Sequence, residues 1–141
     1  MLLQLMAGVL LSATASPAAE PPTYWIIVNT SNPVATLGRD EVSRLFLRKA
    51  SIWPGGRIVL PVDQIDSAPV REVFSKDIHR RSIAAIKSFW QQMIFSGRAV
   101  PPPELSSDAG VVAYVKAHPG AIGYVTENPT DGGVRVLAIS G

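Results

Sequence analysis

The segment best suited to bind a ligand joins a β-prone run at 57–62 to a helix that begins at Pro69. Backbone N–H groups in the first turn of a helix have no partners inside the helix, and the helix dipole adds partial positive charge there. An anion is therefore favoured at such a position. The segment predicts a site for phosphate or another small oxyanion.

Polar side chains near this helix start can add to the backbone donors. Gln64 offers an amide, Ser67 a hydroxyl and Arg71 a positive charge. The candidate ligand residues around the helix start are Gln64, Ser67, Ala68, Val70 and Arg71. Ser31 and Asn32, in the turn that follows the first predicted strand, are further candidates for the same site.

Common catalytic and metal-binding patterns are missing from the sequence. His79 and His118 are far apart, and neither belongs to an HExxH pattern, so no metal site is expected. The sequence contains no GxSxG elbow, no GxxxxGK[ST] loop and no GxGxxG motif. Asp63 and Asp66 can be written as an acid and base pair, but loop aspartates near a helix start usually cap the helix. We expect neither an enzyme nor a cofactor.

Composition indicates a globular protein without an affinity for nucleic acid. The chain has 141 residues, 47% of them hydrophobic and 17% charged, which excludes a disordered or coiled-coil protein. The net charge of +2 comes from 13 basic residues scattered among 11 acidic ones. This scatter differs from the basic patch of a nucleic-acid-binding surface. There is no cysteine, so neither disulfides nor thiolate metal ligands are available.

The first residues resemble a cleavable export signal. An apolar run at 2–11 is interrupted only by Gln4, and small residues follow, so cleavage after Ala15 or Ala19 is expected. The run is too short to cross hydrocarbon about 30 Å thick, which needs about 20 residues. The pattern predicts a signal peptide at 1–19, a periplasmic or extracellular mature protein and no stable membrane insertion.

The remaining sequence alternates between strand and helix patterns. Strands are predicted at 24–29, 57–62, 121–125 and 134–139. Helices are predicted at 39–47, 69–78, 82–96 and 106–118. The clearest amphipathic helix is 82–96, whose expected buried side chains are Ile83, Ile86, Phe89, Trp90, Met93 and Ile94. This order predicts one α/β domain at 24–141 with a mixed or parallel sheet covered by helices.

Three segments in this order resemble a known family. A helix and turn at 42–56 include Phe46-Leu-Arg-Lys and Trp53-Pro-Gly-Gly, and Val59-Leu-Pro-Val precedes the candidate loop. The most specific segment is Pro119-Gly-Ala-Ile-Gly-Tyr-Val. Together they resemble the phosphate-type solute-binding proteins of ABC transporters, from about residue 25 to residue 139. The resemblance implies a single lobe, the second, of a type II periplasmic-binding-protein-like fold, with a mixed sheet flanked by helices.

The resemblance also assigns roles in the candidate loop. The family pattern of approximately R-S-D-G-S-G-T aligns with 64–70 and implies that Asp66 accepts the proton of a protonated phosphate. Gln64 stands where the family has arginine, and Ser67, Ala68 and Pro69 replace a Gly-Ser-Gly run. Glutamine lacks the charge and the donor fork of arginine.

The sequence is compatible with two functions. A single lobe implies an open half-site for an oxyanion, which a homodimer or a partner protein completes. The alternative is a ligand-free envelope module, derived from a solute-binding lobe, that contacts other proteins.

Overall fold

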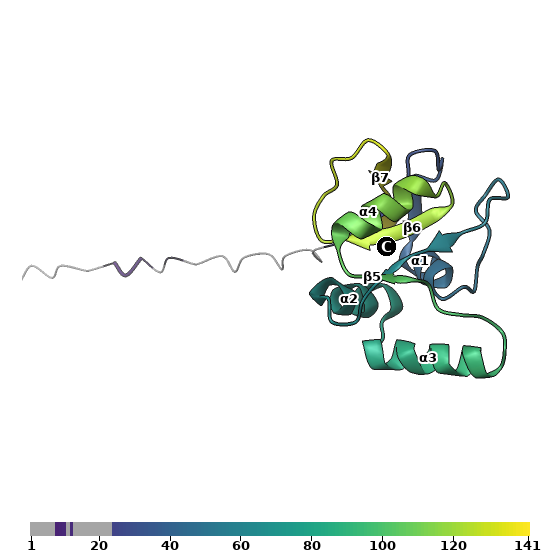
Figure 1. The fold of residues 1–141 in the computed structure, drawn as a ribbon. Coiled ribbons are helices and arrows are strands. Elements are labelled where there is room, and N and C mark those ends of the chain that lie inside the picture. The colour runs from purple at the N-terminus through teal and green to yellow at the C-terminus, as the bar shows by residue number, and fades with distance from the viewer. Residues whose placement is uncertain (1–7, 11, 13–23) are drawn as a thin grey trace, which may run out of the picture.

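The fold centres on two buried, antiparallel strands, β1 (Trp25–Asn29) and β6 (Ala121–Val125), whose register pairs Trp25 with Val125. All five residues of β6 are buried. Strand β7 (Val134–Val136) lies antiparallel on the other side of β1, and β3 (Leu60–Pro61) lies parallel to β6. The order β3-β6-β1-β7 is a mixed sheet, which confirms the predicted fold class (Figure 1).

The computed structural model describes residues 8–10, 12 and 24–141. Most of the expected signal peptide at 1–19 therefore lies outside the described residues, and this expectation remains untested by the structure. Among the described residues, no helix combines the length and the apolar character that a membrane crossing needs.

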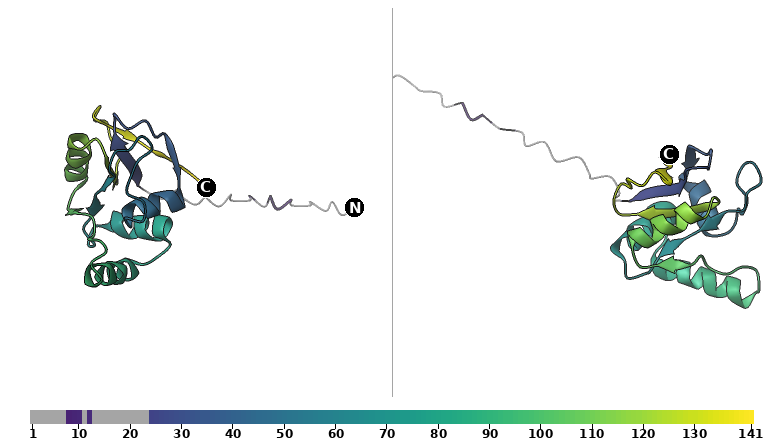
Figure 2. Two further views of the ribbon diagram at one scale, coloured as in Figure 1. Left: turned by 90° about the vertical axis from the view of Figure 1, so that its right-hand side faces the viewer. Right: turned by 45° about the horizontal axis from the view of Figure 1, so that its top comes forward.

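Helices cover both faces of the sheet, as the left view of Figure 2 shows. The helical segments are α1 (Arg39–Phe46), α2 (Pro69–Phe74), the π-helical turn η1 (Ser75–His79), α3 (Ile83–Phe95) and α4 (Asp108–Ala117). Successive residues of β1 point to opposite faces. Ile26 and Val28 pack in one core cluster with α1, α2 and η1, whereas Ile27 packs in another cluster with α4. This alternation explains why the strand is apolar at every central position.

Helix α3 packs less extensively than its sequence pattern predicts. Ile86 and Trp90 form a small cluster with Leu47, and Phe89 and Met93 are partly buried. Ile94, expected in the apolar face, is 53% exposed. Figure 1 shows α3 at the edge of the molecule, beside α2 and away from the central sheet, so only one side of the helix has a packing partner.

Two predicted strands are shorter or divided in the structure. Within 57–62, only Leu60–Pro61 pairs in the central sheet; Trp53 N–H bonds the Arg57 carbonyl across the preceding turn. The expected strand 134–139 divides at Leu137, whose N–H bonds the Ile26 carbonyl. After it, β8 (Ala138–Ser140) pairs in parallel with β2 (Thr36–Gly38), which the sequence did not predict.

A second short ladder lies beside the candidate loop. Strand β4 (Asp63–Gln64) pairs in parallel with β5 (Glu104–Leu105), and neither strand was expected. The ladder holds the polar residues after β3 in extended conformation before the chain enters α2. It therefore determines which side chains of this segment face the interior.

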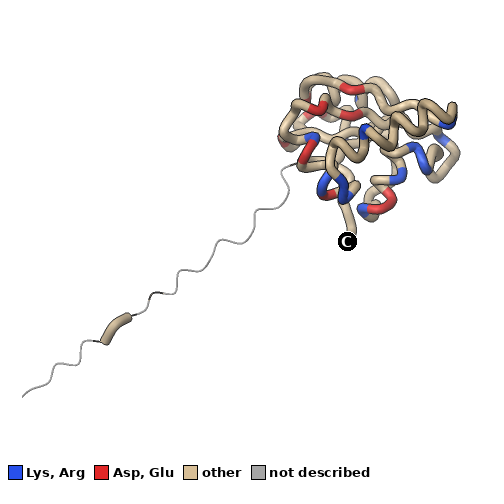
Figure 3. The backbone as a smooth tube through the Cα atoms, turned by 90° about the horizontal axis from the view of Figure 1, so that it is seen from below, with Lys and Arg blue, Asp and Glu red and all other residues tan. Residues whose placement is uncertain are grey.

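Acidic and basic residues are interspersed on the side of the molecule that Figure 3 shows. Several basic side chains are paired with acidic ones, including Lys76 with Glu72 and Lys116 with Asp131. These local pairs leave no strongly basic patch on this side of the molecule.

The two glycines of the Pro119–Val125 segment allow close packing. A Cβ on Gly120 would lie 2.1 Å from the carbonyl oxygen of Ile58, and one on Gly123 would lie 2.6 Å from a methyl group of Val111. Real Cβ atoms do not approach other heavy atoms this closely. The two glycines are therefore needed for the contact between this segment and its neighbours.

Gly120→Ala should lower the free energy of unfolding by about 3 kcal/mol, because the new methyl group meets fixed backbone. Gly132→Ala is the matched control, since a Cβ there has no heavy atom within 4 Å. The control should change stability by less than about 0.5 kcal/mol. Urea unfolding of both variants measures the difference; equal stabilities would contradict the packing role of Gly120.

Partly buried His79 makes stability depend on pH. Its Nδ1 lies 2.7 Å from the Ser43 hydroxyl, and burial is the main cause that lowers the pKa of His79 from 6.5 to about 4. A histidine with a lowered folded-state pKa contributes stability above pH 6.5 that is lost as the pH falls towards 4. The loss is at most about 3 kcal/mol. Chemical unfolding between pH 7 and 4.5 should show a steeper loss for wild type than for His79→Gln; parallel curves would contradict this origin.

Candidate functional site

The candidate loop and the start of α2 border an open depression of about 480 Å³. It lies near the carboxyl end of β6. Its lining residues are Gln64, Ile65, Ser67, Ala68, Pro69, Val70, Ser106, Ser107, Asp108 and Thr126. We call it the Ser67 depression. Four of the residues expected from the sequence are therefore brought together: Gln64, Ser67, Ala68 and Val70.

Gln64 forms part of the wall and is held by the interior. Only 3% of the residue is exposed. Its Nε2 donates to the Tyr124 carbonyl and to Asp108 Oδ1, both at 3.0 Å. These bonds use both amide hydrogens, so the Gln64 side chain positions other groups and has no further donor for a ligand.

Asp108, the first residue of α4, brings a carboxylate to the depression. Besides Gln64, its Oδ1 accepts from the Thr126 hydroxyl at 3.2 Å. Its Oδ2 accepts the backbone N–H groups of Thr126 at 2.9 Å and Glu127 at 3.2 Å. The position in the first turn of a helix also favours the negative charge. Four donors therefore satisfy this carboxylate within the protein.

Arg71, expected among the ligand residues, does not line the Ser67 depression. The residue is 3% exposed. Its Nη1 donates to the Gln64 carbonyl at 2.6 Å and to Glu104 Oε1 at 3.2 Å, and its Nε lies 3.4 Å from Asp63 Oδ1. The guanidinium is thus turned towards the β4–β5 ladder. We call Arg71, Asp63, Glu104 and Tyr124 the Arg71 cluster.

Tyr124 completes the Arg71 cluster by donating its hydroxyl to Asp63 Oδ1. Both residues are buried. Desolvation is the main cause that raises the pKa of Asp63 and of Tyr124 above their ordinary values. The tyrosine therefore keeps its proton, and the cluster is a structural network beneath the depression.

Asp66, expected to accept a phosphate proton, also lies outside the lining of the depression. It is exposed and pairs with Lys87 of α3. The hydrogen bond from Lys87 is the main cause that lowers the pKa of Asp66. Asp66 thus connects the loop to α3, and the carboxylate that the structure places in the depression is that of Asp108.

Ser31 and Asn32, expected to contribute to the same site, lie at the other end of the sheet. They follow the carboxyl end of β1, where Val28 pairs with Ile122 at the amino half of β6. Gln64, in contrast, binds the Tyr124 carbonyl at the carboxyl half of β6. Ser31 and Asn32 line a separate cavity.

Besides Ile65 and Pro69 of the candidate loop, sequence reasoning missed the four lining residues from other segments: Ser106, Ser107, Asp108 and Thr126. Ser107 caps α4, with its Oγ accepting the Gly110 N–H at 3.0 Å. One signal was available, because β3 and β6 are parallel and residues that follow parallel strands meet at the same edge. That argument places Thr126, directly after β6, near the loop that follows β3.

Each of the two histidines has a hydrogen-bonding contact within the fold. His79 contacts Ser43, and His118 Nδ1 lies 2.7 Å from the Tyr114 carbonyl. Within the described part of the chain, no group of three or more His, Cys, Asp or Glu side chains is placed to hold a metal ion.

Comparison with known proteins gives a structural likeness without a sequence match. No protein-family model and no curated protein matches this sequence. An ABC-type phosphate transport receptor from Vibrio cholerae superposes with a TM-score of 0.65 at 17% identity, over 83% of this chain and 46% of the receptor.

Two further solved structures are similar. A putative phosphate ABC transporter substrate-binding protein with bound phosphate, from Clostridium perfringens, has a TM-score of 0.65 at 17% identity, over 83% of this chain and 44% of its own. A possible phosphate-binding protein from Planctomyces limnophilus has a TM-score of 0.62 at 15% identity, over 84% of this chain and 41% of its own.

This chain has a single-lobe, periplasmic-binding-protein-like fold. It spans less than half the length of these three structures. The expected lobe architecture is thus confirmed.

The Asp108 carboxylate should stabilise the wall of the depression. Asp108→Ala removes the acceptor of the Thr126 and Glu127 N–H groups, and we expect the free energy of unfolding to fall by about 1–2 kcal/mol. Asp40→Ala, in the first turn of α1 and exposed, is the control and should cost less than about 1 kcal/mol. Urea unfolding compares them; an Asp108 variant as stable as wild type would contradict the bracing role.

Proposed function

We propose that this protein is an exported solute-binding module that holds a small oxyanion, such as phosphate, in the Ser67 depression. The observation that carries the proposal is the hydroxyl-lined depression at the start of α2, in a fold shared with phosphate-binding proteins. Ser67 and Ser106 bring hydroxyl groups to its wall, whereas the Thr126 hydroxyl donates to Asp108. The signal-like pattern at 1–19 supports export.

The charges around the depression predict modest affinity. Among the described residues its lining contains Asp108 and no lysine or arginine, and the guanidinium of Arg71 is bonded elsewhere. Pro69 contributes no N–H at the helix start. An anion here is bound through neutral donors, close to a carboxylate that opposes it.

The open shape predicts that a second protein surface completes the site. Ligand pockets usually bury most of the ligand, whereas this depression opens on one side. The chain covers less than half of the similar binding proteins. A second copy of this chain or a partner protein, in the context of ABC transport, supplies the other wall in this proposal.

Titration calorimetry with phosphate tests the proposal. Wild-type protein should give saturable heat at millimolar ligand, and Ser67→Ala should weaken binding about fivefold through loss of one hydroxyl donor. Ser88→Ala, at an exposed position of α3, is the matched control and should bind like wild type. Sulfate and molybdate in parallel titrations identify which oxyanion is preferred.

Absence of heat with all three anions would contradict oxyanion binding and favour the second candidate, a ligand-free envelope module. The internal bonds of Arg71 and the exposed end of α3, with Phe95 at 93% exposure, favour that function. Cross-linking in envelope extracts, with Phe95→Ser as the comparison, then distinguishes a specific complex from a free monomer. A monomer with measurable anion affinity rejects this candidate.

A further inference from the structure

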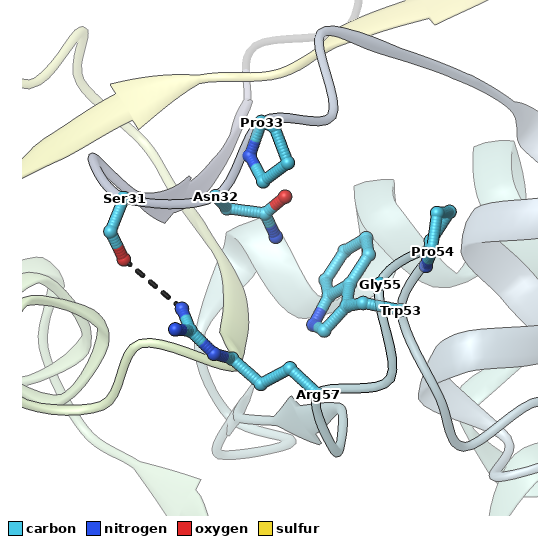
Figure 4. A pocket seen from close by; sticks show the side chains of 7 residues that line it. All are labelled: Ser31, Asn32, Pro33, Trp53, Pro54, Gly55 and Arg57. Atoms are coloured by element: carbon cyan, nitrogen blue, oxygen red, sulfur yellow. Dashed lines mark hydrogen bonds between the residues drawn. The ribbon is translucent and has the colours of Figure 1, made fainter.

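A second cavity lies between the turn after β1 and the turn that precedes β3. Its volume is about 180 Å³. Figure 4 shows its lining residues, which are Ser31, Asn32, Pro33, Trp53, Pro54, Gly55 and Arg57. We call it the Asn32 cavity. It shares no lining residue with the Ser67 depression.

Asn32 brings a buried donor without a partner into this cavity. The residue is 3% exposed, and its side-chain Nδ2 has no hydrogen-bond partner among the described residues. Its other polar atoms are bonded: the N–H to the Asn29 carbonyl, and the carbonyl to Arg135. A buried amide donor left unpaired costs about 1–3 kcal/mol, so an acceptor at this position is strongly favoured.

The orientation of the Asn32 amide is determined by its neighbour. Its Oδ1 accepts the Val34 N–H at 2.9 Å. A flipped amide would place the NH₂ group against this N–H donor, so Oδ1 and Nδ2 cannot exchange. Figure 4 shows Nδ2 directed into the space beside Trp53. The free donor therefore points into the cavity.

Arg57 adds a positive charge at the rim. Its Nη1 donates to the Ser31 Oγ at 3.2 Å, and the Ser31 hydroxyl donates in turn to Asn29 Oδ1 at 2.8 Å. Ser31 thus positions the guanidinium and has its own proton engaged. Arg57 is exposed and forms no ion pair among the described residues. Most of its donor fork is available to an anion.

Apolar surface forms the rest of the wall. Trp53 is 4% exposed, and its Nε1 is anchored to the Gly120 carbonyl at 2.8 Å, which fixes the indole ring. Pro33 and Pro54 also line the cavity (Figure 4). The cavity therefore combines one neutral donor and one cation with a rigid apolar wall.

We propose that the Asn32 cavity binds a small organic carboxylate. One carboxylate oxygen accepts from Asn32 Nδ2, the carboxylate pairs with Arg57, and a short apolar group lies against Trp53. A carboxylate has only two polar oxygens to satisfy, which matches this donor set. Phosphate would place further charged oxygens against the apolar wall, where their desolvation is unfavourable. This inference is independent of the Ser67 depression.

Titration of the ¹⁵N-labelled protein with sodium propionate tests the proposal. The side-chain NH₂ resonances of Asn32 should shift saturably at millimolar propionate, whereas sodium chloride at equal ionic strength should not reproduce the shift. Sodium phosphate provides the third arm. Phosphate binding at this site as tightly as propionate would overturn the ligand class, and no saturable shift with propionate would overturn the site.

Two variants report on the donors separately. Asn32→Asp keeps the acceptor for the Val34 N–H but removes the donor, and Arg57→Gln removes the charge at an exposed position. Each should weaken propionate binding by about tenfold or more, read from backbone shifts of the Trp53 turn. Ser67→Ala, in the other depression, should bind propionate like wild type. Unchanged affinity in Arg57→Gln would contradict the proposal even if Asn32→Asp folded poorly.

Discussion

The buried guanidinium of Arg71 connects the elements that shape the Ser67 depression. From α2 it reaches the Gln64 carbonyl and the Asp63 carboxylate in β4, and Glu104 in β5. A buried charge without partners costs several kcal/mol, so the loss of any one of these partners would destabilise the fold. Because Glu104 remains partly exposed, the set also extends from the interior to the surface. The Arg71 cluster therefore holds the loop between β4 and α2 in its conformation.

The same interaction limits the chemistry of the depression. An arginine that satisfies three internal acceptors cannot also present its charge to an oxyanion. The carboxylate of Asp108 is saturated by donors from Gln64, Thr126 and Glu127, so it braces the opposite wall. The fold is shared with phosphate-binding proteins, but the charges that would strengthen phosphate binding are used for structure here. Sharing a fold therefore supports a binding surface more strongly than a particular ligand.

Sequence patterns predicted the parts of the fold whose signals are local. The apolar runs of β1 and β6 and the helix α4 all lie within the ranges predicted for them. The β4–β5 ladder was not predicted, because two-residue strands depend on tertiary pairing and have no periodicity of their own. The break of the last strand at Leu137 was not predicted either, because it depends on the pairing of β8 with β2.

The candidate sites show the same division between local and long-range information. Ser67 and the start of α2 could be found from a loop followed by a helix. Thr126 joins them through the parallel pairing of β3 and β6, and Asp108 through the pairing of β4 and β5. The inward direction of Arg71 depends on Asp63 and Glu104, which no helix pattern reveals.

The antiparallel pairing of β1 and β6 explains why the predicted ligand residues separate into two cavities. Residues that follow β1 and residues beside the carboxyl end of β6 must lie at opposite ends of this pair. Asn32 therefore cannot contribute to a ligand held at Ser67, although both segments follow strands and both carry polar residues. Each cavity has its own donors: hydroxyl groups beside a saturated carboxylate in one, and an unpaired amide with an exposed arginine in the other. Their different donors and wall chemistry favour different ligands, and their places at opposite ends of the strand pair keep one ligand from contacting both.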